Sequence, residues 1–247
     1  MKHGAPIRPV ATCVAYLCAG CVILLTVPLM MLLLLLLPER SCRKNKFLFG
    51  LLNLFYRGIT FSILTPVVIE GRDLVPTSPA IFVGNHQSTL DVPLMGMLLN
   101  GRPHLWYALA YYARFPVLGF FIRRLGFSLD RGSSAGAAHG FLRGLRRLEK
   151  DPCNVLIFPE GARFVDGSVH EFLKGFALLA RKTGMPVVPV FMPFNGRAYP
   201  PAAFWIRKQA LLVVVGPLFE LKPDEADEAF SERVHAWFVH QQGLLSR

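Results

Sequence analysis

The feature that most constrains this chain of 247 residues is an uncharged apolar run of 28 residues, 10–37. About 20 such residues span the hydrocarbon core of a bilayer as a helix. The stretch Ala19-Gly20-Cys21 is similar to a lipoprotein cleavage site, but the apolar run continues for sixteen residues past Cys21, where mature lipoproteins turn polar. We therefore expect residues 1–65 to form uncleaved, membrane-anchoring helices.

A second apolar stretch, residues 47–69, is interrupted by Asn53, Arg57 and Pro66. These interruptions favour an interfacial or re-entrant helix over a second span. Pro28 offers a place where the first segment could break into a hairpin that enters one leaflet only. A single span and a monotopic hairpin both remain open at this stage.

The charge pattern indicates the partner and the side of the membrane. The net charge is +11 and 53% of residues are hydrophobic, although residues 220–247 are mildly acidic. A basic, apolar body favours an anionic phospholipid surface over nucleic acid. Four basic residues follow the first apolar run, whereas two precede it, so the positive-inside rule places the body on the cytoplasmic face.

Residues 66–247 alternate between short β-rich runs and helical stretches, which predicts an α/β domain with a mostly parallel sheet flanked by helices. The predicted strands are residues 66–70, 80–83, 105–110, 126–129, 155–158, 187–191 and 211–215. The predicted helices are residues 89–100, 133–150, 171–183 and 224–242. Ligands of such sheets gather at the carboxyl ends of strands.

The first polar motif, Asn-His-Gln-Ser-Thr-Leu-Asp at residues 85–91, directly follows a predicted strand. A histidine acts as a general base when a carboxylate fixes its tautomer, and Asp91 is the candidate partner of His86. In one continuous helix the two side chains would lie roughly 140° apart. We therefore expect His86 to precede a helix that Ser88 caps.

The second polar motif is Phe-Pro-Glu-Gly-Ala-Arg at residues 158–163, again at the end of a predicted strand. Gly161 permits close approach of the backbone, and Arg163 can bind a phosphate through a fork of donors. Glu160 can orient that arginine or a substrate hydroxyl. The alternative interpretation is a surface Glu–Arg pair after a buried strand.

These motifs resemble those of the glycerolipid acyltransferases, the family of 1-acyl-sn-glycerol-3-phosphate and lysophospholipid acyltransferases. The likeness covers about residues 71–193 in four blocks in the family's order. The four blocks are residues 85–91, Arg-Leu-Gly-Phe-Ser-Leu-Asp-Arg-Gly at 124–132, residues 158–163 and Val-Pro-Val at 188–190. Four blocks in register make a more specific signal than any single motif.

The resemblance implies transfer of a fatty acyl group from acyl-CoA or acyl carrier protein to the hydroxyl of a lysophospholipid, such as 1-acyl-sn-glycerol-3-phosphate. His86 and Asp91 would be catalytic, with backbone N–H groups of the nearby turn stabilising the oxyanion. Binding of the acceptor's head group would fall to four residues: Glu160, Gly161, Arg163 and Arg131. No metal or cofactor is required.

The chain departs from the family pattern at two positions. Ala162 stands where the family usually has threonine, and Ala110 stands where relatives acting on lysophosphatidate carry a lysine. Both changes weaken the expectation of a phosphomonoester acceptor. Arg114, Arg123 or Arg124 would compensate, or the acceptor is another lysolipid such as lyso-ornithine lipid.

Two other classes of function stay open. Gly-Ser-Ser-Ala-Gly at residues 132–136 fits the Gly-x-Ser-x-Gly pattern of hydrolases, with Ser134 as nucleophile and Asp166 with His170 or His235 as partners. A membrane esterase would use that triad. A non-catalytic lipid-binding protein would need no pairing of His86 with Asp91.

Overall fold

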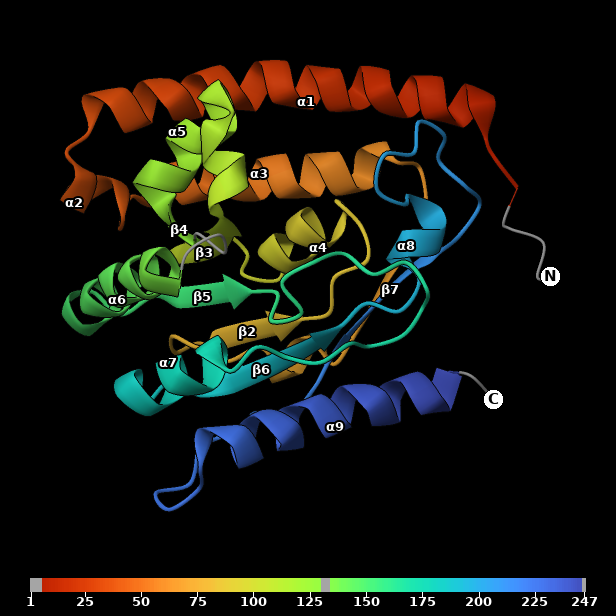
Figure 1. Ribbon diagram of the computed structural model, residues 1–247. Helices are drawn as coiled ribbons and strands as arrows, with labels where there is room; N and C mark the ends of the chain where they lie inside the picture. Colours follow the sequence, from red (N-terminus) through yellow and green to blue (C-terminus); the bar gives the residue numbers. More distant parts are fainter. Residues whose placement is uncertain (1–5, 130–133, 246–247) are drawn as a thin grey trace.

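The computed structural model describes residues 6–129 and 134–245, which fold around a seven-stranded sheet (Figure 1). The strands stand in the order β1-β7-β6-β2-β5-β3-β4. Their bounds are β1 Val67–Glu70, β2 Ile81–Gly84, β3 His104–Leu109, β4 Gly126–Leu129, β5 Asn154–Ile157, β6 Val187–Phe191 and β7 Leu211–Val215. The β6–β7 pair is antiparallel and the other neighbouring pairs are parallel. The predicted α/β class with a mostly parallel sheet is confirmed.

Helices cover both faces of the sheet. Their bounds are α1 Pro9–Leu36, α2 Glu39–Cys42, α3 Lys46–Ser62, α4 Asp91–Met97, α5 Pro116–Leu125, α6 Ser134–Lys150, α7 Gly175–Thr183, α8 Asn195–Ala198 and α9 Asp227–Leu245, with 3₁₀ turns η1 Arg72–Leu74 and η2 Ala110–Arg114. The side chains of β2 alternate between two cores, as the period of a strand requires. Phe82 joins the core under α1, α3 and α4, whereas Ile81 and Val83 join the core under α6, α7 and α9.

Three of the predicted helices have different bounds in the structure. Helix α4 begins at Asp91 rather than residue 89, α7 begins at Gly175 rather than residue 171, and α9 is displaced by three residues. Helix α5 was not predicted, and it begins with a proline. Proline at the first helical position is favoured, since its missing N–H has no partner there anyway.

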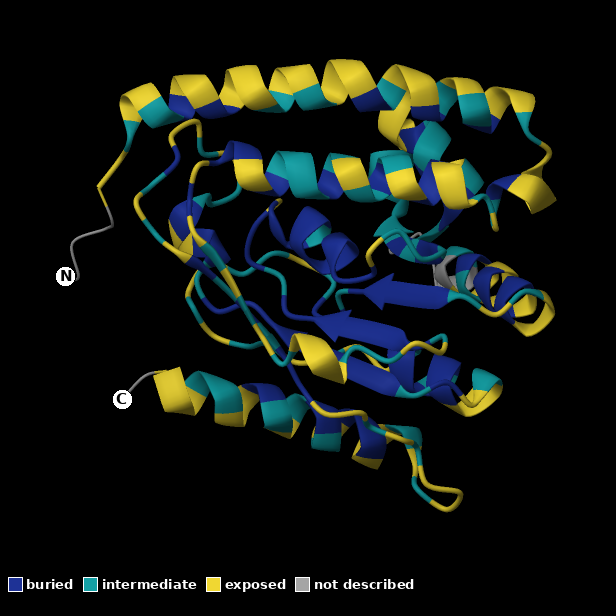
Figure 2. Cartoon of the chain, turned by 180° about the vertical axis from the view of Figure 1, so that it is seen from behind, coloured by how far each residue is buried: buried dark blue, intermediate teal, exposed yellow. Residues whose placement is uncertain are grey.

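Helices α1 and α3 form an antiparallel hairpin that lies across one face of the α/β body (Figure 1). The turn of this hairpin is at α2, and α1 continues unbroken through Pro28, so the alternative of a break at Pro28 is not the one that the structure shows. A β-carbon at Gly58 would lie 2.8 Å from the Val22 side chain, so this glycine lets the two helices approach closely. The outer face of α1 is exposed along its length (Figure 2).

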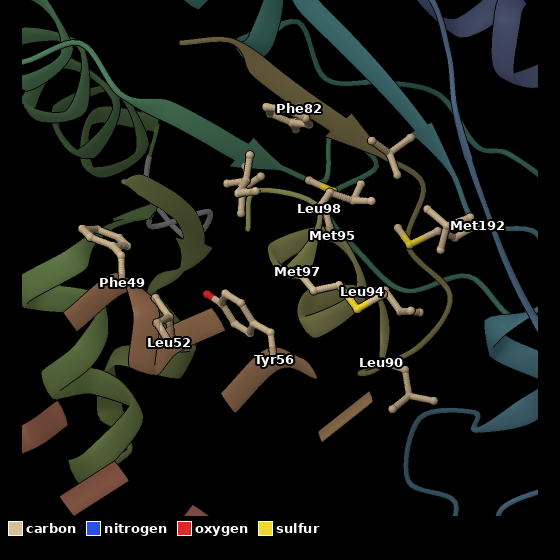
Figure 3. Close-up of a cluster of buried hydrophobic side chains, with 14 of the residues drawn as sticks. Phe49, Leu52, Tyr56, Phe82, Leu90, Leu94, Met95, Met97, Leu98 and Met192 are labelled. Atoms are coloured by element: carbon tan, nitrogen blue, oxygen red, sulfur yellow. The ribbon is translucent and has the colours of Figure 1, made fainter. Parts of the chain in front are cut away.

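Helix α3 lies between α1 and α4 and contributes to the same core as the sheet. Figure 3 shows Tyr56 of α3 beside Leu94 and Met97 of α4. A side chain at Gly96 would collide with the Tyr56 ring, so the glycine sets the spacing of α3 and α4. The division of the chain into membrane-anchoring helices, residues 1–65, and an α/β domain, residues 66–247, therefore remains a prediction about which residues contact lipid.

The C-terminal end of α1 is fastened by Arg124 of α5. Its Nη2 donates to the carbonyl oxygens of Leu34 and Leu37, the last of these at 2.7 Å. A cation at a helix C-terminus satisfies carbonyl groups that lack a partner within the helix. Because Arg124 binds the end of α1, it does not replace the lysine that relatives acting on lysophosphatidate carry at the position of Ala110.

Candidate active site

His86 lies in the turn that joins the carboxyl end of β2 to α4. Its Nδ1 is 2.8 Å from Oδ2 of Asp91, a fully buried side chain at the first residue of α4. The pairing predicted from sequence is therefore present. Because the carboxylate can only accept, Nδ1 carries the proton and Nε2 of the neutral ring presents a lone pair. The His86 side chain is 15% exposed, so solvent or a ligand can reach it.

The Asp91 carboxylate is held by the turn that it helps to form. Its Oδ2 also accepts the backbone N–H groups of Gln87 at 2.6 Å and Ser88 at 2.7 Å. Its Oδ1 accepts Nδ2 of Asn195, at the start of α8, at 2.8 Å. Four donors therefore converge on this buried carboxylate and fix its orientation.

Ser88 takes a different part from the predicted helix cap. Its Oγ accepts the N–H of Leu90 at 3.2 Å and donates to the carbonyl oxygen of Tyr199 at 2.6 Å. The serine thus orders the turn ahead of α4, while Leu90 occupies the N-cap position. The consequence for His86 is as predicted, because the histidine precedes the helix and the aspartate begins it.

An aromatic stack fixes the plane of the His86 ring. Phe158 lies parallel to it, with ring centroids 4.0 Å apart and an interplanar angle of 6°. Trp106 of β3 lies 5.6 Å from Phe158 on centroids. The Trp106 Nε1–H donates to the Tyr56 hydroxyl at 2.9 Å, and that hydroxyl contacts Nε2 of His104 at 3.1 Å. The stacked rings of Phe158 and Trp106, with the hydroxyl of Tyr56 that accepts from Trp106, connect His86 to α3 of the N-terminal hairpin. We name these three residues the Tyr56–Trp106–Phe158 stack.

Glu160 is buried and holds two loop backbones together. Its Oε2 accepts the N–H of His86 at 2.8 Å, and its Oε1 accepts the N–H of His170 at 3.1 Å. Burial raises the pKa of Glu160 to about 7, against the lowering effect of these two hydrogen bonds. Both oxygens serve the protein's own backbone, so contact of Glu160 with a substrate stays a prediction.

Arg163 is brought to the histidine turn by the chain reversal after β5. Gly161 adopts a left-handed conformation, φ 68°, which a glycine adopts without steric cost. The Arg163 guanidinium donates to Oγ1 of Thr89 at 2.8 Å and to the Tyr112 hydroxyl. Of the predicted site residues, His86, Asp91, Glu160, Gly161 and Arg163 thus gather at the carboxyl ends of β2 and β5.

The remaining predicted residues have different outcomes. Arg131 lies outside the described residues. The N–H groups of His86, Gln87 and Ser88 are bound by carboxylates, so they do not supply the oxyanion donors that we expected from this turn. Ala110 begins η2, on the segment that carries Tyr112. Arg114 and Arg123 are exposed.

Sequence reasoning did not identify Asn195, Thr89, Tyr112 or Phe158 as parts of the site. Phe158 and Thr89 stand inside the two motifs, so their position alone was a signal. Asn195 and Tyr112 come from distant segments, and nothing in their surroundings distinguishes them before the chain is folded. Asn195 donates to Asp91, and Tyr112 accepts from Arg163.

The rival hydrolase triad is only partly assembled. Asp166 and His170 are paired, with Oδ2 2.8 Å from Nε2, and the His170 ring stacks on Phe164. Ser134 is the first residue of α6, one residue after the predicted start of this helix. The described contacts of the His170 ring come from its own loop, and none comes from α6.

The site presents a general base beside a cation. Among the described residues, no three His, Cys, Asp or Glu side chains gather as a metal site requires. A neutral imidazole held by a buried carboxylate can take a proton from a hydroxyl, and a nearby guanidinium can hold an anionic group. This combination suits activation of a hydroxyl on a substrate that carries negative charge.

Comparison with known proteins agrees with this chemistry. The profile of the family described as Acyltransferase matches residues 66–193, more than half of the chain. The chain belongs to this acyltransferase family. The match contains the histidine motif, the Glu160–Arg163 motif and the strands between them, so the acyltransferase fold and the site described above coincide.

Named relatives are 1-acyl-sn-glycerol-3-phosphate acyltransferases. The chloroplastic BAT2 of Brassica napus is 29% identical over 160 residues, which are 63% of this chain and 46% of the BAT2 chain. The present chain therefore spans under half the length of that relative. The protein of Cocos nucifera is 28% identical over 226 residues, 85% of this chain and 68% of its own. The crystal structure of PlsC from Thermotoga maritima is similar with a TM-score of 0.79 at 23% identity, covering 96% of this chain and 95% of that one.

Proposed function

We propose that this acyltransferase moves a fatty acyl group from an acyl thioester to the free hydroxyl of 1-acyl-sn-glycerol-3-phosphate, giving phosphatidic acid. The observation that carries the proposal is the 2.8 Å contact of His86 Nδ1 with Asp91, which leaves Nε2 as the base. The names of the relatives support the choice of acceptor. Acyl-CoA and acyl carrier protein are the two candidate donors.

In the proposed reaction His86 Nε2 takes the proton of the acceptor hydroxyl as the hydroxyl oxygen attacks the thioester carbonyl carbon. The resulting imidazolium is stabilised by the buried Asp91 carboxylate. When the tetrahedral intermediate collapses, the carbon–sulfur bond breaks and the thiolate takes the proton from His86. The enzyme forms no covalent intermediate and ends in its starting protonation state.

Arg163 is the proposed anchor of the acceptor's phosphate. Its guanidinium is held beside the histidine turn by the hydroxyl groups of Thr89 and Tyr112, and no carboxylate among the described residues forms an ion pair with it. The alanines at 110 and 162 remove two donors that the family usually supplies. A lysolipid with another head group, such as lyso-ornithine lipid, is therefore the second candidate acceptor.

The α1–α3 hairpin is the proposed membrane attachment, with the catalytic face on the cytoplasmic side. Among the described residues, α1 is the one helix whose length and composition would let it cross a membrane, a test that the core helix of a soluble protein can also pass. Its N-terminal end is bound to the body through Thr12, which accepts the N–H of Ile206, and through Tyr16, whose hydroxyl donates to the Phe204 carbonyl. A helix fixed at both ends along the body favours monotopic insertion over a span.

The test is an acceptor and donor panel with purified, detergent-solubilised protein. Labelled oleoyl-CoA and palmitoyl–acyl carrier protein are each offered with lysophosphatidate, lysophosphatidylcholine, lysophosphatidylethanolamine and lyso-ornithine lipid. Labelled phosphatidic acid as the fastest-formed product supports the proposal. A product formed only from a lysolipid without a phosphomonoester contradicts the acceptor, and labelled free fatty acid in place of any diacyl product contradicts the transferase.

A further inference from the structure

A basic cavity lies at the amino ends of the strands, opposite to the end that carries His86. Its volume is about 210 Å³, and its wall includes Pro103, which precedes β3, and Cys153, which precedes β5. These positions are at the amino ends of the strands, whereas His86 and Glu160 follow the carboxyl ends of β2 and β5. The cavity is therefore separate from the active site.

Arg147 of α6 is the residue that makes this cavity unusual. It lines the cavity and is only 7% exposed. Among the described residues no acceptor forms a hydrogen bond or ion pair with its guanidinium, which lies 5.4 Å from the centre of the Phe127 ring. Burial and the nearby Arg43 guanidinium lower the pKa of Arg147, although an arginine stays charged at neutral pH. A buried cation without an acceptor is costly unless a ligand supplies one.

The carboxylates near the cavity are already engaged by other cations. Asp151, which itself lines the cavity, is 2.5 Å from Lys44 Nζ, and Glu39 pairs with Arg43 one helical turn away. Burial raises the pKa of the Cys153 thiol to about 11, so that side chain is neutral at physiological pH. The charge of Arg147 is the one that these neighbours leave unbalanced.

We propose that the cavity binds a phosphate group between Arg147 and Arg43, taken either from the head group of an anionic lipid or from free phosphate. A tetrahedral anion fits the volume and would give Arg147 the charged acceptor that it lacks, while the Nε of Arg43, which has no hydrogen-bond partner among the described residues, offers a second donor. Arg43 and Lys44 stand in the connection from α2 to α3, where the chain turns at the end of α1. A bound phosphate would tie the hairpin of α1 and α3 to α6.

A lipid head group as the source of the phosphate rests on the proposed membrane attachment, whereas binding of free phosphate does not.

The test is a titration of the full chain in neutral detergent with sodium phosphate, compared with sodium chloride of equal ionic strength, in which the midpoint of thermal unfolding is followed. All variants carry Arg163→Ala, which removes phosphate binding at the active site. Arg147→Gln is compared with Arg146→Gln, an exposed neighbour on the same helix that makes the same change of charge.

We expect phosphate to raise the midpoint of thermal unfolding of the Arg163→Ala parent and of its Arg146→Gln variant. In the Arg147→Gln variant the affinity for phosphate should fall at least ten-fold. Asp151→Asn frees Lys44 and should tighten binding several-fold, which keeps the test decisive if Arg147→Gln does not fold. Equal phosphate shifts in all variants, or no change of affinity with Asp151→Asn, would overturn the site.

Vesicles of phosphatidylcholine with and without phosphatidylglycerol then distinguish the sources. If Arg147→Gln floats less than Arg146→Gln with the vesicles that contain phosphatidylglycerol, and equally with those that lack it, the site binds a lipid head group. Equal flotation of the two variants overturns the lipid source and leaves free phosphate as the ligand.

Discussion

The carboxylate of Asp91 binds Nδ1 of His86 at 2.8 Å through the same oxygen that receives the backbone N–H groups of Gln87 and Ser88. One buried oxygen therefore orients the base and closes the turn that carries it. Catalysis and local folding depend on the same atom, which makes substitutions at this position informative about both.

Asp91→Asn should lower kcat for acyl transfer by about 10³- to 10⁴-fold, because an amide cannot hold the His86 tautomer or stabilise the imidazolium. The change should also lower the free energy of unfolding by about 1–3 kcal/mol, since backbone N–H groups lose a charged acceptor. Initial rates and chemical denaturation of the same preparation measure the two effects. A variant with more than a tenth of the wild-type kcat would contradict the assigned role of Asp91.

Glu160 predicts a pH dependence of stability. Its pKa of about 7 in the folded protein lies above the ordinary 4.5, so the folded state holds a proton that the unfolded chain releases. Stability from this group is fully present below pH 4.5 and is lost as pH rises through 7. Between pH 4.5 and 8 the loss is on the order of 3 kcal/mol.

Glu160→Gln should therefore show a shallower fall in the free energy of unfolding between these pH values than the wild type. Glu171→Gln, at an exposed carboxylate in the same loop, is the matched control and should follow the wild-type curve. Urea denaturation at intervals of half a pH unit gives the comparison. Parallel curves for wild type and Glu160→Gln would show that Glu160 does not titrate in this range.

The Tyr56–Trp106–Phe158 stack predicts effects on kcat from residues that need not touch substrate. Phe158→Leu keeps an apolar side chain but loses the parallel contact with His86, and kcat should fall roughly 2- to 10-fold with little change in KM. Phe158→Tyr, which keeps the ring, should restore the rate. A rise in KM alone, or no rescue by tyrosine, would place Phe158 in substrate binding instead.

Arg163→Ala should raise the KM for lysophosphatidate about 10- to 100-fold, since it removes a charged hydrogen-bond donor from the proposed phosphate site. Its effect on a lysolipid without a phosphomonoester should be smaller. Arg143→Ala, an exposed arginine on α6, serves as the control for loss of surface charge. An unchanged KM in Arg163→Ala would remove this residue from acceptor binding.

The sequence predicted the strands well because each is a short run of β-branched and apolar residues bounded by glycine, proline or asparagine. The helix ends were less certain, as α4 shows, because Ser88 and Asp91 both suit the start of a helix. In the structure Asp91 is the first helical residue, and its carboxylate also accepts Asn195 from a distant segment. No local pattern contains that contact.

The site was predictable where its residues lie within one motif and obscure where they come from different elements. His86 and Asp91 were paired correctly from five residues of sequence. Glu160 was expected to face substrate, yet it binds the backbones of His86 and His170, which only the folded loops bring together. Arg124 matched a family block in sequence, but in the structure it caps α1.

The proposed reaction assigns the chemistry to His86 and not to Ser134. The most direct measurement is acyl transfer from labelled oleoyl-CoA to lysophosphatidate by wild type, His86→Ala and Ser134→Ala, with thermal unfolding showing that each variant is folded. We predict that diacyl product is lost in His86→Ala and retained in Ser134→Ala. Product retained in folded His86→Ala, or free fatty acid lost only in Ser134→Ala, would contradict the account.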